Sequence, residues 1–115
     1  MGMKEGKKAL ETALAKKGVT VLYFSALWYG PCKGFAPVME KLAQEYDGRE
    51  NVKFVKVNVD EMPEVAGDCG ITGASAVAVM LKGRMVRRFV GVMEEWKIRE
   101  AVERVLGARG KKREG

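Results

Sequence analysis

The chain has 115 residues, of which 47% are hydrophobic and 31% are charged, and its formal net charge is +6. This length fits one folded domain, and the composition excludes an intrinsically disordered chain and any apolar run of the roughly 20 residues that a membrane-spanning helix requires. The absence of histidine, with two cysteines, Cys32 and Cys69, excludes histidine-dependent catalysis and leaves too few thiols for a four-ligand zinc site or an iron–sulfur cluster. We therefore expect neither a metal nor a cofactor.

Basic residues lie near both ends of the chain. We interpret residues 108–115 as a basic tail, expected to be disordered, after a single folded domain spanning 1–107; contact with an acidic surface or nucleic acid is the alternative. Basic residues elsewhere are scattered and not interleaved with aromatic residues, which disfavours nucleic acid. The N-terminal basic residues are not followed by an apolar core, so they do not form a secretory signal. We expect a cytoplasmic protein without membrane contact.

The first half of the chain predicts a helix, a strand, a second helix and a second strand. Residues 4–17 place apolar side chains on one helical face. Residues 19–24 are a nearly continuous run of β-forming residues, typical of a parallel strand that is covered on both faces. A helix over 32–46 follows, since Phe35 and later apolar residues recur at helical spacing, and it is expected to kink at Pro37, which lacks a backbone donor. Alternating valines predict a strand over 52–59.

The second half predicts a short helix, a hairpin and a final helix. Asp60 is a suitable N-cap for a helix over 61–68. Strands over 76–81 and 84–90 are joined by two turn residues, a spacing typical of an antiparallel hairpin. The last helix is expected to start near Met93, with glutamates at its positive end.

The order of these elements predicts the fold class. Alternation of strand, helix and strand implies a right-handed parallel crossover, and the closing hairpin adds antiparallel strands. We expect an α/β fold with a mixed central sheet of about four strands and helices on both faces.

The residues that carry chemistry follow the first predicted strand, in the run Trp28-Tyr29-Gly30-Pro31-Cys32-Lys33. This run resembles the thioredoxin family, in which Trp-Cys-Gly-Pro-Cys-Lys occupies the same turn between strand and helix. The resemblance extends from about Val19 to Leu106, and further matches are Pro37, the strand Val55-Lys56-Val57-Asn58-Val59-Asp60, the approach Gly70-Ile71-Thr72-Gly73, the turn Lys82-Gly83 and the pair Val90-Gly91. It implies the thioredoxin fold.

Three departures from the family pattern affect its chemistry. Tyr29 stands where the family has the cysteine that attacks a target disulfide, and a phenol cannot form or exchange a disulfide bond. Ser75 stands where the family has a cis-proline facing the redox motif, so we expect a trans bond before it. Tyr23 replaces a buried aspartate that moves protons beneath the second cysteine, although its lysine partner is retained as Lys56. Together these changes indicate that the dithiol function has been lost.

Cys32 is the candidate redox thiol. At the start of a helix and beside Lys33, the positive environment would favour its thiolate form. The alternative interpretation, which we prefer, is that Cys32 is only a small, shielded residue of the first helical turn. Cys69 is either a secondary thiol or an ordinary helix-end residue. The family layout places the two cysteines too far apart for a disulfide, so we expect both to be reduced.

The sequence favours a thioredoxin-like protein that acts as a protein-binding or single-thiol module in redox-related processes. The alternative is a thiol-disulfide oxidoreductase in which Cys32 works with an external thiol, from glutathione or from a partner. A third hypothesis is a structural or nucleic-acid-associated module that uses the basic tail. Protein-disulfide reductase activity by a dithiol cycle is expected to be absent or very weak. The expected surface for a protein or peptide partner comprises Trp28, Tyr29, Ala74, Ser75 and Gly91.

Overall fold

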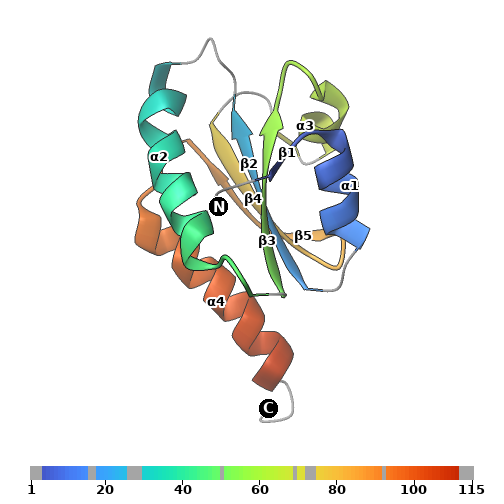
Figure 1. Cartoon of the computed structure of the whole chain (residues 1–115), viewed down its shortest axis with the longest axis vertical. Coiled ribbons are helices and arrows are strands. Elements are labelled where there is room, and N and C mark those ends of the chain that lie inside the picture. The colour runs from blue at the N-terminus through green and yellow to red at the C-terminus, as the bar shows by residue number, and fades with distance from the viewer. Residues whose placement is uncertain are drawn as a thin grey trace.

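The computed structural model describes residues 4–15, 18–25, 30–49, 51–68, 70–71, 75–91 and 93–111. The elements alternate between strands and helices along the chain (Figure 1). In order they are β1 (Lys4–Glu5), α1 (Lys7–Ala15), β2 (Val19–Ser25), α2 (Gly30–Glu45), β3 (Val52–Asn58), α3 (Pro63–Asp68), β4 (Ala76–Leu81), β5 (Arg84–Val90) and α4 (Glu95–Lys111).

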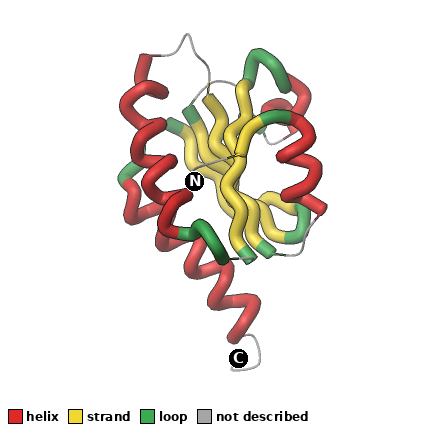
Figure 2. The backbone as a smooth tube through the Cα atoms, viewed as in Figure 1, coloured by secondary structure: helices red, strands yellow, loops and turns green. Residues whose placement is uncertain are grey.

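One mixed sheet forms the centre of the molecule, with strand order β1-β3-β2-β4-β5. β1, β3 and β2 run parallel, whereas β4 is antiparallel to β2 and β5 is antiparallel to β4. Helices α2 and α4 cover one face, and α1 and α3 cover the other (Figure 2). The predicted mixed sheet with helices on both faces is therefore confirmed.

β2 lies in the middle of the sheet, and all seven of its residues are buried. Its side chains alternate between the two faces. Val21 and Tyr23 belong to the core under α2 and α4, whereas Leu22 and Phe24 belong to the core under α1 and α3. This arrangement explains the nearly continuous apolar run in the sequence, because both faces of the strand need apolar side chains.

The N-terminal segment differs from the prediction. Residues 4 and 5 form β1, which pairs with β3 at Val55 and Lys56, and the helix expected over 4–17 begins later, at Lys7. Gly6 separates the two elements with a φ of 103°, a left-handed conformation that a helix cannot contain. The four long strands are those predicted, and β1 adds a two-residue fifth strand at the edge.

The start of α3 is also organised differently. The prediction of Asp60 as the N-cap is wrong, because α3 begins at Pro63. Proline suits the first helical position, since the N–H that it lacks would have no partner there. The turn before α3 is held instead by the Asn58 side chain, whose Oδ1 accepts from the N–H groups of Asp60, at 2.8 Å, and Glu61, at 3.3 Å.

The C-terminal helix continues farther than expected. α4 extends to Lys111, so the boundary predicted between residues 107 and 108 falls inside a helix, and the first four residues of the expected disordered tail are helical. Residues 112–115 lie outside the described part of the chain. Within the described residues, no helix is long and apolar enough to cross a membrane.

The predicted hairpin between β4 and β5 is confirmed. Its turn consists of Lys82 and Gly83, with φ values of 54° and 82°. Two successive positive φ values match the two-residue hairpin turn whose twist fits that of the flanking strands.

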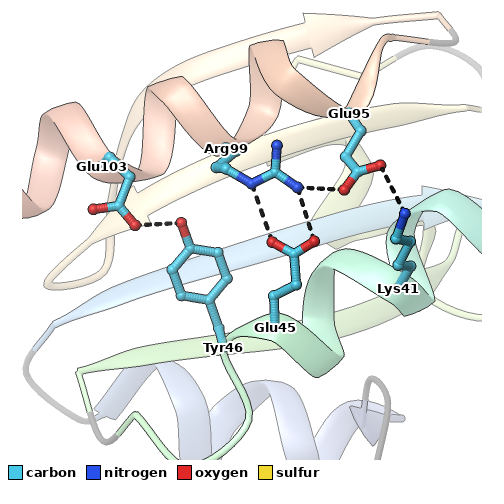
Figure 3. A network of polar contacts seen from close by, with 6 residues as sticks. All are labelled: Lys41, Glu45, Tyr46, Glu95, Arg99 and Glu103. Carbon is cyan, nitrogen blue, oxygen red and sulfur yellow. Dashed lines mark hydrogen bonds and ion pairs between the residues drawn. The ribbon is translucent and has the colours of Figure 1, made fainter.

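A polar network joins the C-terminal half of α2 to α4 (Figure 3). The guanidinium of Arg99 donates two hydrogen bonds to Glu45, at 3.0 and 2.8 Å, and a third to Glu95. Lys41 lies 3.9 Å from Glu95. Hydrogen bonding to Arg99 lowers the pKa of the Glu45 carboxyl. The network therefore connects α4 to α2, the helix on which the candidate motif lies.

A second connection, from the turn after α2 to α4, uses an aromatic side chain. Tyr46 is buried, and its hydroxyl donates to Glu103 Oε2 at 2.5 Å. Arg49 lies over the Tyr46 ring, 5.1 Å from its centroid, and 3.5 Å from the same carboxylate. Burial, and then the hydrogen bond to Glu103, raise the pKa of Tyr46.

Candidate functional site

The motif lies between the end of β2 and the start of α2. β2 ends at Ser25, and Gly30, Pro31 and Cys32 form the first turn of α2. Proline is tolerated in a first turn because no carbonyl of the helix needs its N–H. The backbone of Cys32 is thus at the positive end of a 16-residue helix, as the sequence predicted, and α2 starts two residues earlier than expected. Trp28 and Tyr29 lie outside the described residues.

Two of the predicted surface residues come together at the end of the sheet where β2 ends, because Phe24 of β2 is in register with Ala76 of β4. The Gly91 N–H donates to the Ser75 carbonyl oxygen at 2.8 Å, which continues the β4–β5 ladder beyond the strand ends. Gly91 has a φ of 94°, a conformation suited to glycine. Ser75 is buried, with 1% of its surface exposed, so it can support a partner surface only from beneath. Ala74, and with it the predicted trans bond to Ser75, lies outside the described residues.

Beneath the first turns of α2, Tyr23 occupies the position where the resemblance implies a carboxylate. Its side chain is fully buried. The ring meets the Phe35 ring edge-on, with centroids 5.5 Å apart and an interplanar angle of 89°. Phe35 lies three residues after Cys32 in α2. Two aromatic side chains therefore fill the core beneath the first turns of α2, and neither can accept a proton near neutral pH as a carboxylate could.

Lys56 remains close to this pair. In the parallel ladder between β2 and β3, Tyr23 is in register with Lys56, and on its other side with Val77 of β4. Side chains in register on adjacent strands point to the same face of a sheet. The lysine is half-exposed. Lys56 is thus adjacent on the sheet to Tyr23, the position at which the family resemblance implies a carboxylate.

Gly70, the residue after Cys69, is contacted by an arginine from β5. Cys69 itself lies outside the described residues, between the last residue of α3 and Gly70. Arg88 donates from Nη1 to the Gly70 carbonyl oxygen at 3.3 Å. Gly70 has a φ of 72°, and a Cβ placed on it would lie 2.4 Å from the same nitrogen. The positive φ favours glycine here, whereas the Arg88 guanidinium, at the end of a flexible side chain, could shift to make room for a Cβ.

Sequence reasoning missed two features of this site. Phe35 was assigned to the apolar face of a helix, but its contact with Tyr23 depends on how α2 lies on the sheet. The Arg88–Gly70 contact joins residues 18 positions apart. The glycine itself was a signal, since an isolated glycine after a helix often marks a left-handed residue.

A family model named Thioredoxin matches residues 3–104, nearly the whole chain. The chain belongs to the thioredoxin family. It is similar to thioredoxin of Mus musculus, with 38% identity over 93 residues that cover 79% of this chain and 86% of that protein. It is also similar to thioredoxin of Bacillus subtilis, with 37% identity over 95 residues that cover 83% of this chain and 89% of that protein.

The three-dimensional comparison agrees with the family. The X-ray structure of Fasciola hepatica thioredoxin aligns with a TM-score of 0.75 and 34% sequence identity, covering 89% of this chain and 98% of that one. A mutant thioredoxin from Halobacterium salinarum aligns with a TM-score of 0.74 and 27% identity, covering 88% and 86%. The family and the thioredoxin fold predicted from the motif are therefore confirmed. Members of this family are redox proteins that interact with protein partners and thiols.

Proposed function

We propose that this thioredoxin-family protein has lost the dithiol disulfide-reductase mechanism and acts by binding a protein partner at the surface around its degenerate motif. The proposal depends on one observation, the presence of Tyr29 three residues before Cys32. The partner surface comprises Trp28, Tyr29, Ala74 and Gly91, with Ser75 supporting it from beneath.

The chemistry of disulfide reduction explains why this position matters. A first thiolate attacks one sulfur of the target disulfide, forms a mixed disulfide and releases one target thiol. A second thiol then attacks the mixed disulfide, releases the other target thiol and leaves an intramolecular disulfide in the enzyme. A phenol has a reference pKa of about 10 and forms no bond to sulfur in such an exchange. With Tyr29 in the first position, neither step can take place within the motif.

The surroundings of the motif support the same proposal. The second thiol of a dithiol cycle must lose its proton as it attacks, and a buried carboxylate beneath it assists. Here Tyr23 fills that position and packs against Phe35 in a fully buried aromatic pair. Ser75 provides an ordinary amide in place of the proline that the resemblance implies. Three residues of one reaction are therefore replaced together.

The placement of Cys32 favours a second candidate function. Its backbone lies in the first turn of α2, where the unpaired N–H groups of the helix stabilise a thiolate. In this alternative, the Cys32 thiolate attacks a disulfide and forms a mixed disulfide. An external thiol, from glutathione or a partner, then resolves it by a second exchange.

Reduction of insulin disulfides by dithiothreitol distinguishes the two candidates. We expect the wild-type protein, Cys32→Ser and Cys69→Ser all to leave the rate near that of dithiothreitol alone. The third variant is the matched control, because it removes a thiol outside the motif. Catalytic turnover by the wild type and Cys69→Ser that disappears in Cys32→Ser, and that also proceeds with glutathione, would replace the binding proposal with the single-thiol alternative.

A reconstruction tests whether Tyr29 is the cause. Tyr29→Cys combined with Ser75→Pro restores both a dithiol pair and the proline, and we expect this variant to reduce insulin measurably. Neither the wild type nor the control that combines Tyr29→Cys with Cys32→Ser should do so. If the wild type already reduces insulin as fast as this double variant, the loss of the dithiol mechanism is refuted.

A further inference from the structure

β5 is the open edge of the sheet. It follows β4 in the strand order, and within the described part of the chain no strand pairs with its other side. It is seven residues long, whereas β1 at the opposite edge has two residues. A long edge strand presents unpaired backbone groups to which another extended segment can bind.

The backbone direction of β5 shows which groups are available. The hydrogen bond from Gly91 to Ser75 extends the β4–β5 ladder, whose register is unbroken along residues 87–90. In an antiparallel ladder, residues that exchange hydrogen bonds with the neighbouring strand alternate with residues whose N–H and C=O point away from it. The N–H and C=O groups of Arg88 and Val90 therefore point to the open edge.

The exposed side chains of β5 include three large apolar residues. Met85, Val86 and Val90 are 40%, 43% and 66% exposed. Phe89, by contrast, is buried in the core under α2 and α4. Apolar surface of this extent on an edge strand favours contact with other apolar side chains.

The hairpin is strongly basic. Lys82, Arg84, Arg87 and Arg88 lie within seven residues, and the sequence has no aspartate or glutamate from Cys69 to Met93. Among the described residues, Lys82, Arg84 and Arg87 form none of the ion pairs. Arg87 lies over the Phe89 ring at 4.9 Å, so its charge remains available at the surface.

We propose that β5 binds an extended, acidic segment of a partner protein, which adds to the sheet as a sixth strand. Main-chain hydrogen bonds to Arg88 and Val90 would hold the segment, its apolar side chains would contact Val86 and Val90, and its carboxylates would pair with Arg84 and Arg87. A second copy of this chain is disfavoured, because two β5 edges would bring arginines together. Nucleic acid is disfavoured, because the aromatic residue of β5 is buried and cannot stack on bases.

None of the β5 residues that carry this proposal belongs to the partner surface around the motif, although Val90 directly precedes Gly91, so the proposal does not depend on the function proposed above. Charged residues on an edge strand also protect sheets from aggregation. The two roles differ in one measurable respect. Protection requires that nothing pairs with the outward amides, whereas strand addition requires that an acidic segment slows their hydrogen exchange.

The experiment uses the full chain and a capped peptide of alternating glutamate and valine with as many residues as β5. We expect saturating peptide to slow amide hydrogen exchange at Arg88 and Val90 by at least about tenfold. Exchange at Phe89, whose amide already pairs with β4, should change little. A lysine–valine peptide, and a glutamate–valine peptide with N-methyl groups at alternate residues, should both bind at least about tenfold more weakly than the probe peptide.

Variants then test the contribution of charge. Arg84→Glu with Arg87→Glu should weaken binding of the glutamate–valine peptide at least about tenfold. Lys7→Glu with Lys8→Glu is the matched control, because it changes the net charge by the same amount on exposed residues of α1, a helix that contacts β1 and β3. It should leave the affinity for the glutamate–valine peptide unchanged. Peptide binding without protection of Arg88 and Val90 would overturn the proposal. So would equal binding of the lysine–valine peptide, tighter binding of oligothymidylate at this edge, or dimerisation through β5.

Discussion

Replacing Tyr23 with aspartate would restore the carboxylate that the resemblance implies, and we expect it to destabilise this chain severely. Tyr23 is fully buried, and its ring packs edge-on against Phe35. Removing a large buried ring costs about 3–5 kcal/mol. A whole domain is stable by only about 5–15 kcal/mol. The variant should therefore lose a large part of its free energy of unfolding, even before the charge is considered.

The charge adds a pH dependence to this loss. Burial raises the pKa of the introduced carboxyl in the folded state above the value of about 3.9 in the unfolded state, although Lys56 in register on β3 partly offsets the shift. A group with a raised pKa in the folded state contributes full stability below the unfolded pKa and loses it as the pH rises toward the folded pKa. Tyr23→Asp should thus be least stable at neutral and alkaline pH.

Tyr23→Asn is the matched control, because it leaves a similar cavity without a titrating group. Urea unfolding of both variants at pH 4 and pH 8 gives the comparison. We expect a similar free energy of unfolding near pH 4 and a less stable aspartate variant at pH 8, at up to about 1.4 kcal/mol per pH unit across the window between the two pKa values. A loss below about 1 kcal/mol for both variants would contradict the tight packing of Tyr23. A pH-independent difference between them would contradict the burial argument.

Four further predictions concern the helix contacts and the hairpin. In a double-mutant cycle of Arg99→Ala with Glu45→Gln, measured by urea unfolding, we expect a coupling free energy of about 1 kcal/mol, because the pair is bidentate but half-exposed. A coupling near zero would show that this ion pair does not contribute to the connection between α2 and α4. Since Arg99 lowers the pKa of Glu45, wild-type stability from this pair should be lost as the pH falls below about 4.3, and the Glu45→Gln variant should not show that component of the loss. Tyr46→Phe should lower the free energy of unfolding by about 1 kcal/mol, because the hydrogen bond to Glu103 is lost. Since the pKa of Tyr46 is raised in the folded state, wild-type stability should also fall as the pH rises above about 10, and an identical alkaline profile in the variant would refute this assignment. Gly83→Ala should lower the melting temperature, since its φ of 82° disfavours a side chain by about 1 kcal/mol, and an unchanged melting temperature would contradict the assigned turn.

Much of the architecture could be predicted because it depends on local patterns. The strands Ala76–Leu81 and Arg84–Val90 match their predicted bounds, since β-forming runs on either side of a lysine–glycine turn specify a hairpin. α2 was predicted within two residues of its start from the spacing of its apolar side chains. The motif at the start of that helix indicated the family, because residue identity and order carry this information without coordinates.

Other features were missed because they depend on partners that are distant in the chain. β1 has two residues and no periodicity of its own, and it is a strand only because β3 offers it a free edge. The Asn58 side chain holds the turn for which Asp60 was predicted as the cap, because the helix begins three residues after that position. α4 continues to Lys111 although its composition there suggested a disordered tail.

The sequence by itself determined the family, the order of the elements and the chemical identity of the motif, including a tyrosine in the position of the attacking cysteine. These follow from residue types and short-range periodicity. The tertiary structure alone decided that Tyr23 is buried against Phe35, that Arg99 reaches Glu45 across 54 positions, and that one edge of the basic strand β5 pairs with no other described strand. Each of these depends on how elements pack in space, since burial and pairing result from contacts between segments that no local pattern specifies.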